Sequence, residues 1–352
     1  MKIFNYSQYI EKVYDSEILG LVAQIHEYKG RQNNLNGISK FKFNKLVEIA
    51  KIQSTEASNK IEGIITTSVR IKQLCENKTT PKNRDEKEIF GYRDVLNTIH
   101  ESFSYIPIKS SYILQLHKDL YKYSEKAIGG KFKNSQNYIS EQRADGTSFV
   151  RFMPLEPYET PEAVERLCEE FNIVASKASV DPLILIPIFI LDFLCIHPFN
   201  DGNGRMSRLL TTLLLYKFDY FIGKYISLEK LIEETKTEYY DALQQSSIGW
   251  NANENNVSWF IKYMLRIILR AYRELEERIK VVGENKLSAT KQVEKAVKTM
   301  YAKFTKKDIL QLCPSISEVS VERALKQLLN QKQIIKHGER KSTFYTRNID
   351  FN

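Results

Sequence analysis

Apolar residues recur along most of this chain at intervals of three and four residues, the spacing of one face of an α-helix. Residues 181–197 are almost wholly apolar and residues 205–218 are rich in apolar residues, and a helix that is apolar on most sides is expected at the centre of a bundle. The 352 residues include only 14 Gly and 9 Pro, so few positions suit turns. The pattern therefore predicts a mainly α-helical fold.

One segment departs from the helical pattern. In residues 131–157, short runs such as 149–152 alternate apolar and polar side chains, and a turn-like Asp145-Gly146 pair stands between two of them. The segment ends at Pro154 and Pro157, which cannot donate to a strand ladder. We expect a β-hairpin there, between helices.

Changes of pattern divide the chain into three expected segments. Residues 1–105 are predicted to form an N-terminal helical region, and residues 106–282 a helical core that contains the hairpin. Residues 285–352 are predicted to form a separate small domain of three helices followed by two short strands, which is the order of elements in a winged helix.

The C-terminal segment is strongly basic. It holds 14 Lys/Arg against 6 Asp/Glu, a net charge of +8 out of +9 for the whole chain, which favours contact with nucleic acid. Glu318 and Glu322 count against this interpretation, because they lie on the helix that would enter the major groove and carboxylates repel phosphate. Protein docking, homodimer formation and presentation of a site for self-modification therefore stand beside DNA binding as alternatives.

Neither a membrane segment nor a secretion signal is expected. The most apolar stretch, residues 183–196, is interrupted by Pro187 and Asp192 and is shorter than the roughly 20 residues that cross a bilayer. The first residues lack the apolar core of a signal peptide. Four scattered cysteines that form no CxxC pair indicate reduced thiols in a cytoplasmic protein, without a zinc site: Cys75, Cys168, Cys195 and Cys313.

The short segment between the two apolar helices, residues 197–208, combines groups suited to binding polyphosphate. Gly202 and Gly204 leave backbone amides available at the start of a helix, where phosphate binds through the amides and the helix dipole. Arg205 and Arg208 stand three residues apart on one face of that helix and can clamp phosphate oxygens.

The same segment holds candidates for metal binding and proton transfer. Asp201 suits a magnesium ion, which takes one or two carboxylates together with substrate phosphates. His197 can accept a proton near neutral pH. Each residue alone has an ordinary structural explanation as a cap, a turn or a solvated charge, but their occurrence together favours chemistry at phosphorus.

The segment reads HPFNDGNGRMSR and resembles the HPFx(D/E)GNGRxxR signature of Fic-domain proteins, which it matches at every defined position. The resemblance implies a helical core that transfers AMP from ATP to a Tyr, Ser or Thr hydroxyl of a target protein or of the enzyme itself. It makes His197 the base that deprotonates the hydroxyl and Asp201 the ligand of Mg²⁺. The residues it assigns to the phosphates of ATP are Gly202, Asn203, Gly204, Arg205, Met206, Ser207 and Arg208.

The resemblance also distinguishes roles within this set. Arg205 would hold the β-phosphate side and Arg208 the γ-phosphate, while Phe199 would anchor the loop in the core. A kinase subfamily with the same fold has lysine at the position of Gly204. The glycine therefore favours AMP transfer over phosphate transfer.

An upstream motif resembles the inhibitory helix of one class of this family. Residues 45–64 have helical spacing, and Ser58, Glu62 and Gly63 match the pattern (S/T)xxxE(G/N). Ser58 and Glu62 are four residues apart, so they share a helix face from which Glu62 would pair with Arg208 and deny it to the γ-phosphate. Some family members also use this glutamate to remove AMP, so an enzyme with both activities is an alternative.

Two further segments resemble parts of the family. The hairpin at 131–157 stands where the family has a flap that docks the target protein by strand addition, although Lys133 and residues 152–155 depart from the usual pattern. Residues 236–243 resemble a YYxxL segment, in which Tyr239 would pack on adenosine or, alternatively, serve only helix packing. A nucleotide-sensing, DNA-binding regulator without turnover is the remaining alternative.

Overall fold

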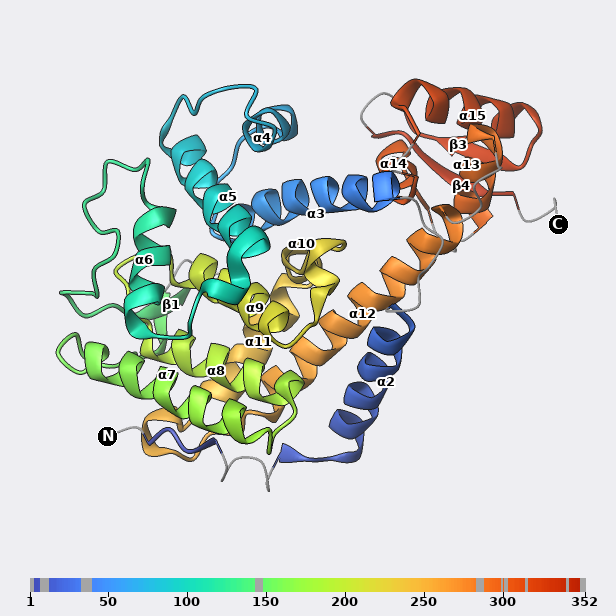
Figure 1. Ribbon diagram of the computed structural model, residues 1–352. Helices are drawn as coiled ribbons and strands as arrows, with labels where there is room; N and C mark the ends of the chain where they lie inside the picture. The colour runs from blue at the N-terminus through green and yellow to red at the C-terminus, as the bar shows by residue number, and fades with distance from the viewer. Residues whose placement is uncertain are drawn as a thin grey trace. The chain divides into compact units, whose positions relative to one another are not determined.

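The computed structural model describes residues 3–6, 13–32, 40–142, 148–282, 288–298, 300, 303–313, 316–339 and 342–348. Helices dominate this part of the chain, and the strands form two small two-stranded sheets (Figure 1). The expected mainly α-helical fold class is confirmed.

Contacts between residues divide the chain into two compact units. The first comprises Met1–Glu27 and Lys51–Ala271, and the second comprises Tyr28–Ala50 and Tyr272–Asn352. Each unit is described by itself. The three-segment division at residues 105 and 282 stays a prediction, and helices α2, α3 and α12 each contribute residues to both units.

Several helices lie wholly or partly in the first unit. Three are shared with the second unit, namely α2 (Ser16–Gln32), α3 (Lys40–Ile61) and α12 (Ser258–Val282). The others are α4 (Ser68–Cys75), α5 (Arg84–Ser102), α6 (Ser110–Leu120), α7 (Thr160–Lys177), α8 (Pro182–Ile196), α9 (Asn203–Lys217), α10 (Leu228–Glu234) and α11 (Lys236–Ser247), with the 3-10 turns η1 (Phe103–Tyr105), η2 (Phe221–Lys224) and η3 (Trp250–Ala252).

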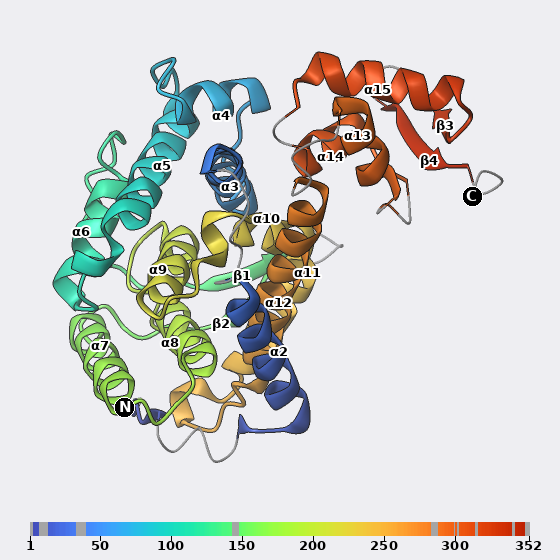
Figure 2. The ribbon, with the colours of Figure 1, turned by 45° about the vertical axis from the view of Figure 1, so that its right-hand side comes forward.

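The two apolar helices α8 and α9 lie at the centre of the first unit, as the sequence predicts. They pack against each other, with α7 beside α8 and α5 beside α9 (Figures 1 and 2). Helix α8 begins where the Asp181 carboxylate accepts the amide of Leu183, and it buries nearly all of its side chains. Its one acidic residue, Asp192, is buried and accepts a hydrogen bond of 2.6 Å from the indole of Trp250. The rigid pair fixes both ends of the loop between them.

The expected hairpin is present in the first unit. Strands β1 (Ile139–Gln142) and β2 (Ser148–Phe152) pair antiparallel, with Ile139 opposite Phe152 and Gln142 opposite Ser148. The register shifts after Ile139, which is the mark of a bulge or irregularity. The turn predicted at residues 144–147 lies outside the described residues.

In the second unit, the C-terminal elements follow the predicted order. They are α13 (Ala289–Lys298), α14 (Lys306–Leu312), α15 (Glu318–Asn330), β3 (Ile334–His337) and β4 (Phe344–Arg347). A buried cluster that includes Val293, Ile309, Val321 and Leu325 joins the three helices, while β3 and β4 pair antiparallel. The assignment as a winged helix stays a prediction, and the linker expected at residues 283–286 lies outside the described residues.

Among the described residues, no helix is long and apolar enough to cross a bilayer.

Candidate active site

A cavity of about 720 Å³ lies in the first unit, where α8 ends and α9 begins. Its walls come from the hairpin, α8, the segment between α8 and α9, and α11. Five of the residues singled out in the sequence line it: Glu62, His197, Gly204, Arg208 and Tyr239. The folding of the chain therefore brings the upstream motif, the loop and the tyrosine segment to one place.

His197 ends α8 in a left-handed conformation, with φ 51° and ψ 62°. Its Nδ1 lies 3.3 Å from the carbonyl oxygen of Leu194. Because a carbonyl only accepts hydrogen bonds, Nδ1 carries the proton, and Nε2 is the nitrogen that can take one up. Burial lowers the pKa of His197 to about 4, so the ring is neutral at physiological pH and has the form that a base requires.

Buried contacts hold the loop after His197 in place. Phe199 is fully buried and stacks on the His117 ring with centroids 3.7 Å apart, which confirms its expected anchoring role. Asn203 holds the backbone of Phe199 through two hydrogen bonds of 2.9 and 2.7 Å. His117 also lies 3.0 Å from the carbonyl of Asp201 and accepts the amide of Gly130 at 3.1 Å. These bonds hold the loop in one conformation and connect it to the segment that leads to the hairpin.

Helix α9 begins at the loop, with Gly202 as its N-cap residue at φ 87°. Met206 is fully buried, and the hydroxyl of Ser207 donates to the carbonyl of Gly204 at 2.8 Å. Neither Met206 nor Ser207 lines the cavity. Their place in the phosphate-binding set stays a prediction.

Arg208 is held by the upstream motif. Its Nε donates to the hydroxyl of Ser58 at 2.8 Å, and its Nη2 donates to the carbonyl of Ser58 at 2.9 Å and to Glu62 Oε1 at 2.8 Å. The arginine side chain is only 3% exposed. The pairing of Glu62 with Arg208 that the sequence predicts is present.

Glu62 lies in a different element from the one expected. Helix α3 ends at Ile61, so Glu62 stands in the turn that follows, although it contacts Arg208 together with Ser58. Gly63 terminates the helix with φ 77°, and the amide of Ile64 donates to the carbonyl of Asn59 at 3.0 Å. This is the hydrogen-bond pattern of a glycine C-cap, and it turns the chain so that the Glu62 carboxylate still reaches Arg208.

The Glu62 carboxylate also lies against the start of α9. A side-chain Cβ on Gly204 would stand 2.2 Å from Glu62 Oε1, far inside contact distance. The carboxylate therefore occupies the space beside Gly204, at the helix N-terminus that is suited to an anion. A residue with a Cβ at position 204 would require the Glu62 carboxylate to move.

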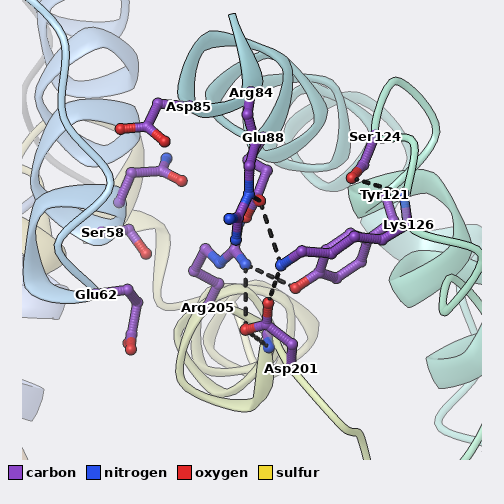
Figure 3. A network of polar contacts seen from close by, with 12 residues as sticks. Ser58, Glu62, Arg84, Asp85, Glu88, Tyr121, Ser124, Lys126, Asp201 and Arg205 are labelled. Atoms are coloured by element: carbon purple, nitrogen blue, oxygen red, sulfur yellow. Dashed lines mark hydrogen bonds and ion pairs between the residues drawn. The ribbon is translucent and has the colours of Figure 1, made fainter.

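Asp201 is engaged by a lysine. Its Oδ1 accepts the amide of Gly202 at 2.7 Å, and its Oδ2 lies 2.5 Å from Nζ of Lys126 (Figure 3). Although burial alone would raise the pKa of Asp201, the hydrogen bond from Lys126 and the charge of Arg205 lower it, so the carboxylate is ionised.

The donor set around Asp201 fits magnesium bound together with a nucleotide. Among the described residues there is no cluster of three or more Asp, Glu, His or Cys side chains that could hold a metal by itself. Asp201 is one ionised carboxylate, and it already attracts a cation, Lys126. A Mg²⁺ ion that takes its other ligands from phosphates and water requires one such carboxylate.

Arg205 is the least exposed of the charged residues in the loop. Its Nη1 lies 2.9 Å from Glu88 Oε2 on α5, an ion pair without hydrogen-bond alignment, and its Nη2 donates to the hydroxyl of Tyr121 at 2.7 Å (Figure 3). Both members of the ion pair are 2% exposed or less. Arg205 does not line the cavity, so its visible role is to fix α9 to α5, and contact with the β-phosphate stays a prediction.

Two tyrosines face the cavity from α11. Tyr239 is 3% exposed and packs against the rings of Tyr240, Phe260 and Tyr263, so its side chain does pack between helices. Tyr240 also lines the cavity and is less buried. Packing of adenosine on Tyr239 stays a prediction. Tyr240, which was not chosen from the sequence as the adenosine contact, is the ring beside it.

The hairpin is tied to the site at its base and at one strand. Lys133 donates to the carbonyl of Ile196 at 3.1 Å, and its own amide donates to the carbonyl of Pro198 at 2.9 Å. Burial lowers the pKa of Lys133 to about 8. On β2, Arg151 donates to Gln244 of α11 at 2.6 Å. The hairpin therefore forms one wall of the cavity.

Sequence reasoning missed Glu88, Tyr121, Lys126 and the anchoring role of His117. For Glu88 a signal exists, because it shares a face of α5 with the buried residues Tyr92, Val95 and Ile99. A carboxylate on an apolar face predicts a buried partner. No comparable signal points to Lys126, which lies in the irregular segment after α6.

The central helix pair, the loop between its helices and the hairpin beside it fall largely within one matched region. Residues 107–215 match the profile described as the Fic/DOC family.

Two relatives in other organisms are both named protein adenylyltransferase. "Protein adenylyltransferase fic-1" of Caenorhabditis elegans is 26% identical over 171 residues, which cover 47% of this chain and 30% of that protein. "Protein adenylyltransferase Fic" of Nematostella vectensis is 24% identical over 234 residues, which cover 62% of this chain and 47% of that protein. The chain thus spans less than half the length of these relatives.

Solved structures share the fold. A Fic family protein from Desulfovibrio desulfuricans aligns with a TM-score of 0.60 at 19% identity, over 96% of this chain and 97% of that one. A Fic domain containing signaling protein from Bacteroides thetaiotaomicron aligns with a TM-score of 0.59 at 23% identity, over 74% of this chain and 95% of that one.

Proposed function

We propose that this protein is a protein adenylyltransferase, which transfers AMP from ATP to a Tyr, Ser or Thr hydroxyl and is inhibited by its own Glu62. The single observation that carries the proposal is that His197, Gly204, Arg208 and Glu62 line one cavity of nucleotide size. The relatives named protein adenylyltransferase, and the Fic domain itself, agree with it and make ATP the substrate.

The chemistry assigned to the site is a displacement at the α-phosphorus of ATP. The target hydroxyl loses its proton to Nε2 of His197 as its oxygen forms a bond to the α-phosphorus, and the bond from that phosphorus to the bridging oxygen breaks, so that pyrophosphate leaves. Amides at the start of α9 and the guanidinium of Arg208 would hold phosphate oxygens. Asp201 would hold Mg²⁺, which offsets the negative charge of the phosphates when bound.

The inhibition follows from competition between two anions for one arginine. Glu62 accepts from Arg208 and fills the space beside Gly204, where phosphate is expected to approach α9. An ATP molecule that enters the cavity with Glu62 in place loses the arginine contact to its γ-phosphate. The nucleotide then binds in a pose that does not present the α-phosphorus to His197.

The target protein is proposed to dock on the hairpin. Strands β1 and β2 pair only with each other among the described residues, so each has an outer edge at which an extended segment can add. Strand addition beside Tyr138 and Ile139, which line the cavity, would carry a hydroxyl toward His197. Self-modification, homodimer formation and a cytoplasmic location stay predictions from the sequence.

Incorporation of labelled AMP tests the proposal. The wild type, Glu62→Gly and Glu62→Gly/His197→Ala would be incubated with α-labelled ATP and Mg²⁺, alone and with a lysate. We expect strong labelling only with Glu62→Gly, because release of Arg208 restores the phosphate site and loss of His197 removes the base. Absence of labelling by Glu62→Gly, in spite of ATP binding measured by calorimetry, would reject AMP transfer.

A second candidate function, DNA binding by the C-terminal elements, gains support from one contact. Lys306 on α14 lies 2.7 Å from both Glu318 and Glu322, so the two carboxylates that count against DNA are partly neutralised. Titration of a labelled duplex at two salt concentrations tests it. Binding that weakens steeply with salt supports DNA contact, and no binding at low salt leaves protein docking as the role of this segment.

A further inference from the structure

The ammonium group of Lys126 lies between two carboxylates. Its Nζ is 2.5 Å from Asp201 Oδ2 and 3.5 Å from Glu88 Oε1 (Figure 3). The lysine side chain is 29% exposed and that of Asp201 is 42% exposed, so solvent ions can reach the contact. Lys126, a cation of the chain itself, thus lies beside Asp201, the proposed metal ligand.

Of these two carboxylates, Asp201 is the one that depends on Lys126. Glu88 already has Arg205 at 2.9 Å and Arg84 at 3.1 Å. Arg205 is a further cation near Asp201, with its Nη2 3.7 Å from Oδ1. The amide of Gly202 donates to Oδ1, whereas Oδ2 contacts the ammonium of Lys126.

Lys126 and a divalent ion compete for this oxygen through charge repulsion. Magnesium binds carboxylate oxygen at about 2.0–2.1 Å and requires near-octahedral geometry, and an ammonium at hydrogen-bond distance from the same oxygen would be repelled by it. The lysine has a flexible stem with several rotatable bonds, so it can leave without any change of backbone.

We propose that Lys126 is a built-in counter-ion of Asp201, which a divalent cation must displace before it binds, so that Lys126 sets the metal concentration at which the site fills. The inference rests on the proposed use of Asp201 as the metal ligand. It makes Lys126 a positioning residue, which keeps the loop charge-balanced when no metal is bound.

Binding of Mn²⁺ alone to the full chain, followed by the electron paramagnetic resonance of free Mn²⁺, tests the proposal without any measurement of AMP transfer. We expect Lys126→Met to bind Mn²⁺ about three- to tenfold more tightly than the wild type, as removal of one charge-assisted hydrogen bond predicts. Lys122→Met is the matched control, because it removes an equal charge from an exposed position in the same segment, where the lysine lies near the Tyr123 ring.

The double variant Lys126→Met/Asp201→Asn locates the effect. We expect it to bind Mn²⁺ no more tightly than the wild type, because the carboxylate that loss of Lys126 would free is then no longer present. Equal Mn²⁺ affinity of the wild type and Lys126→Met, including no detectable binding by either, would overturn the proposal. So would an equal gain in Lys122→Met, or a gain that persists without Asp201. A Glu62→Gly variant that fails to transfer AMP would reject the proposed function and leave this result unaffected.

Discussion

At the scale of single residues, His197 shows how a buried contact decides the chemistry of a side chain. The carbonyl of Leu194 places the proton on Nδ1, and burial lowers the pKa to about 4. A base acts in its unprotonated form, so activity that depends on His197 is expected to persist as the pH falls through 6.5 and to be lost only near the lowered value.

The pH dependence of AMP transfer follows from this assignment. Initial rates of Glu62→Gly between pH 4 and pH 8 are expected to show an acidic limb well below pH 6.5, with circular dichroism used to confirm that the protein is folded at each pH. An acidic limb at the ordinary value for histidine, about 6.5, would contradict the effect of burial on this residue.

The buried ion pair of Glu88 and Arg205 makes a prediction about stability. Glu88→Gln would take from the buried Arg205 its nearest carboxylate, 2.9 Å away, and leave it Asp201 at 3.7 Å, so we expect a cost of up to about 3–5 kcal/mol of unfolding free energy. Glu125→Gln is the control, because that carboxylate is 89% exposed in its contact with Lys87 and its loss should have little effect on stability. Urea unfolding measures both, and equal costs would show that the buried pair contributes no more than a surface pair.

At the scale of elements, the end of α3 decides whether Glu62 reaches Arg208. Gly63 has φ 77°, and no atom lies within 4 Å of the position that a Cβ would take, so any cost of substitution comes from backbone strain alone. Gly63→Ala is expected to cost about 1 kcal/mol at this turn and to raise AMP labelling roughly fivefold over the wild type.

Asparagine provides the matched comparison, because it tolerates the left-handed conformation. Gly63→Asn should therefore label close to the wild-type level. If both variants release the inhibition equally, the position of Glu62 does not depend on this turn, and the account of the helix end is wrong.

The elements also show what could be predicted from the sequence. Helices α8 and α9, the hairpin and the upstream motif are indicated by local periodicity or by a contiguous motif, and all four are present. The stop of α3 at Gly63 could also be predicted, because a glycine after helical spacing is a common C-terminal cap, and Gly63 has φ 77° just after the last residue of the helix, Ile61. Lys126 was missed because its partner, Asp201, lies far along the chain and only tertiary packing joins them.

At the scale of the whole molecule, three histidines link folding to pH, of which His117 is buried and His100 and His197 are half-buried. Burial lowers the pKa of His100 to about 3, and that of His117 and of His197 to about 4. The unfolded chain takes up protons near pH 6.5 while the folded chain does not, so the stability is fully present above that pH and falls as the pH drops toward 4.

The size of this effect is set by the number of protons involved. Each histidine contributes a slope of about 1.4 kcal/mol per pH unit in that interval. His100→Gln is expected to remove about a third of the combined histidine slope, as measured by urea unfolding at a series of pH values. An unchanged slope would mean that His100 is protonated in the folded chain.

One close approach within the site also restricts how such a chain can evolve. A side chain at position 204 would displace Glu62 from Arg208, because its Cβ alone would stand 2.2 Å from the carboxylate oxygen. Substitution of the glycine at position 204 and loss of the glutamate at position 62 are therefore not independent events. If Glu62 inhibits as proposed, a lineage that replaces this glycine weakens the inhibition in the same step, so descendants with a side chain at 204 should have lost the selective reason to keep a glutamate at 62.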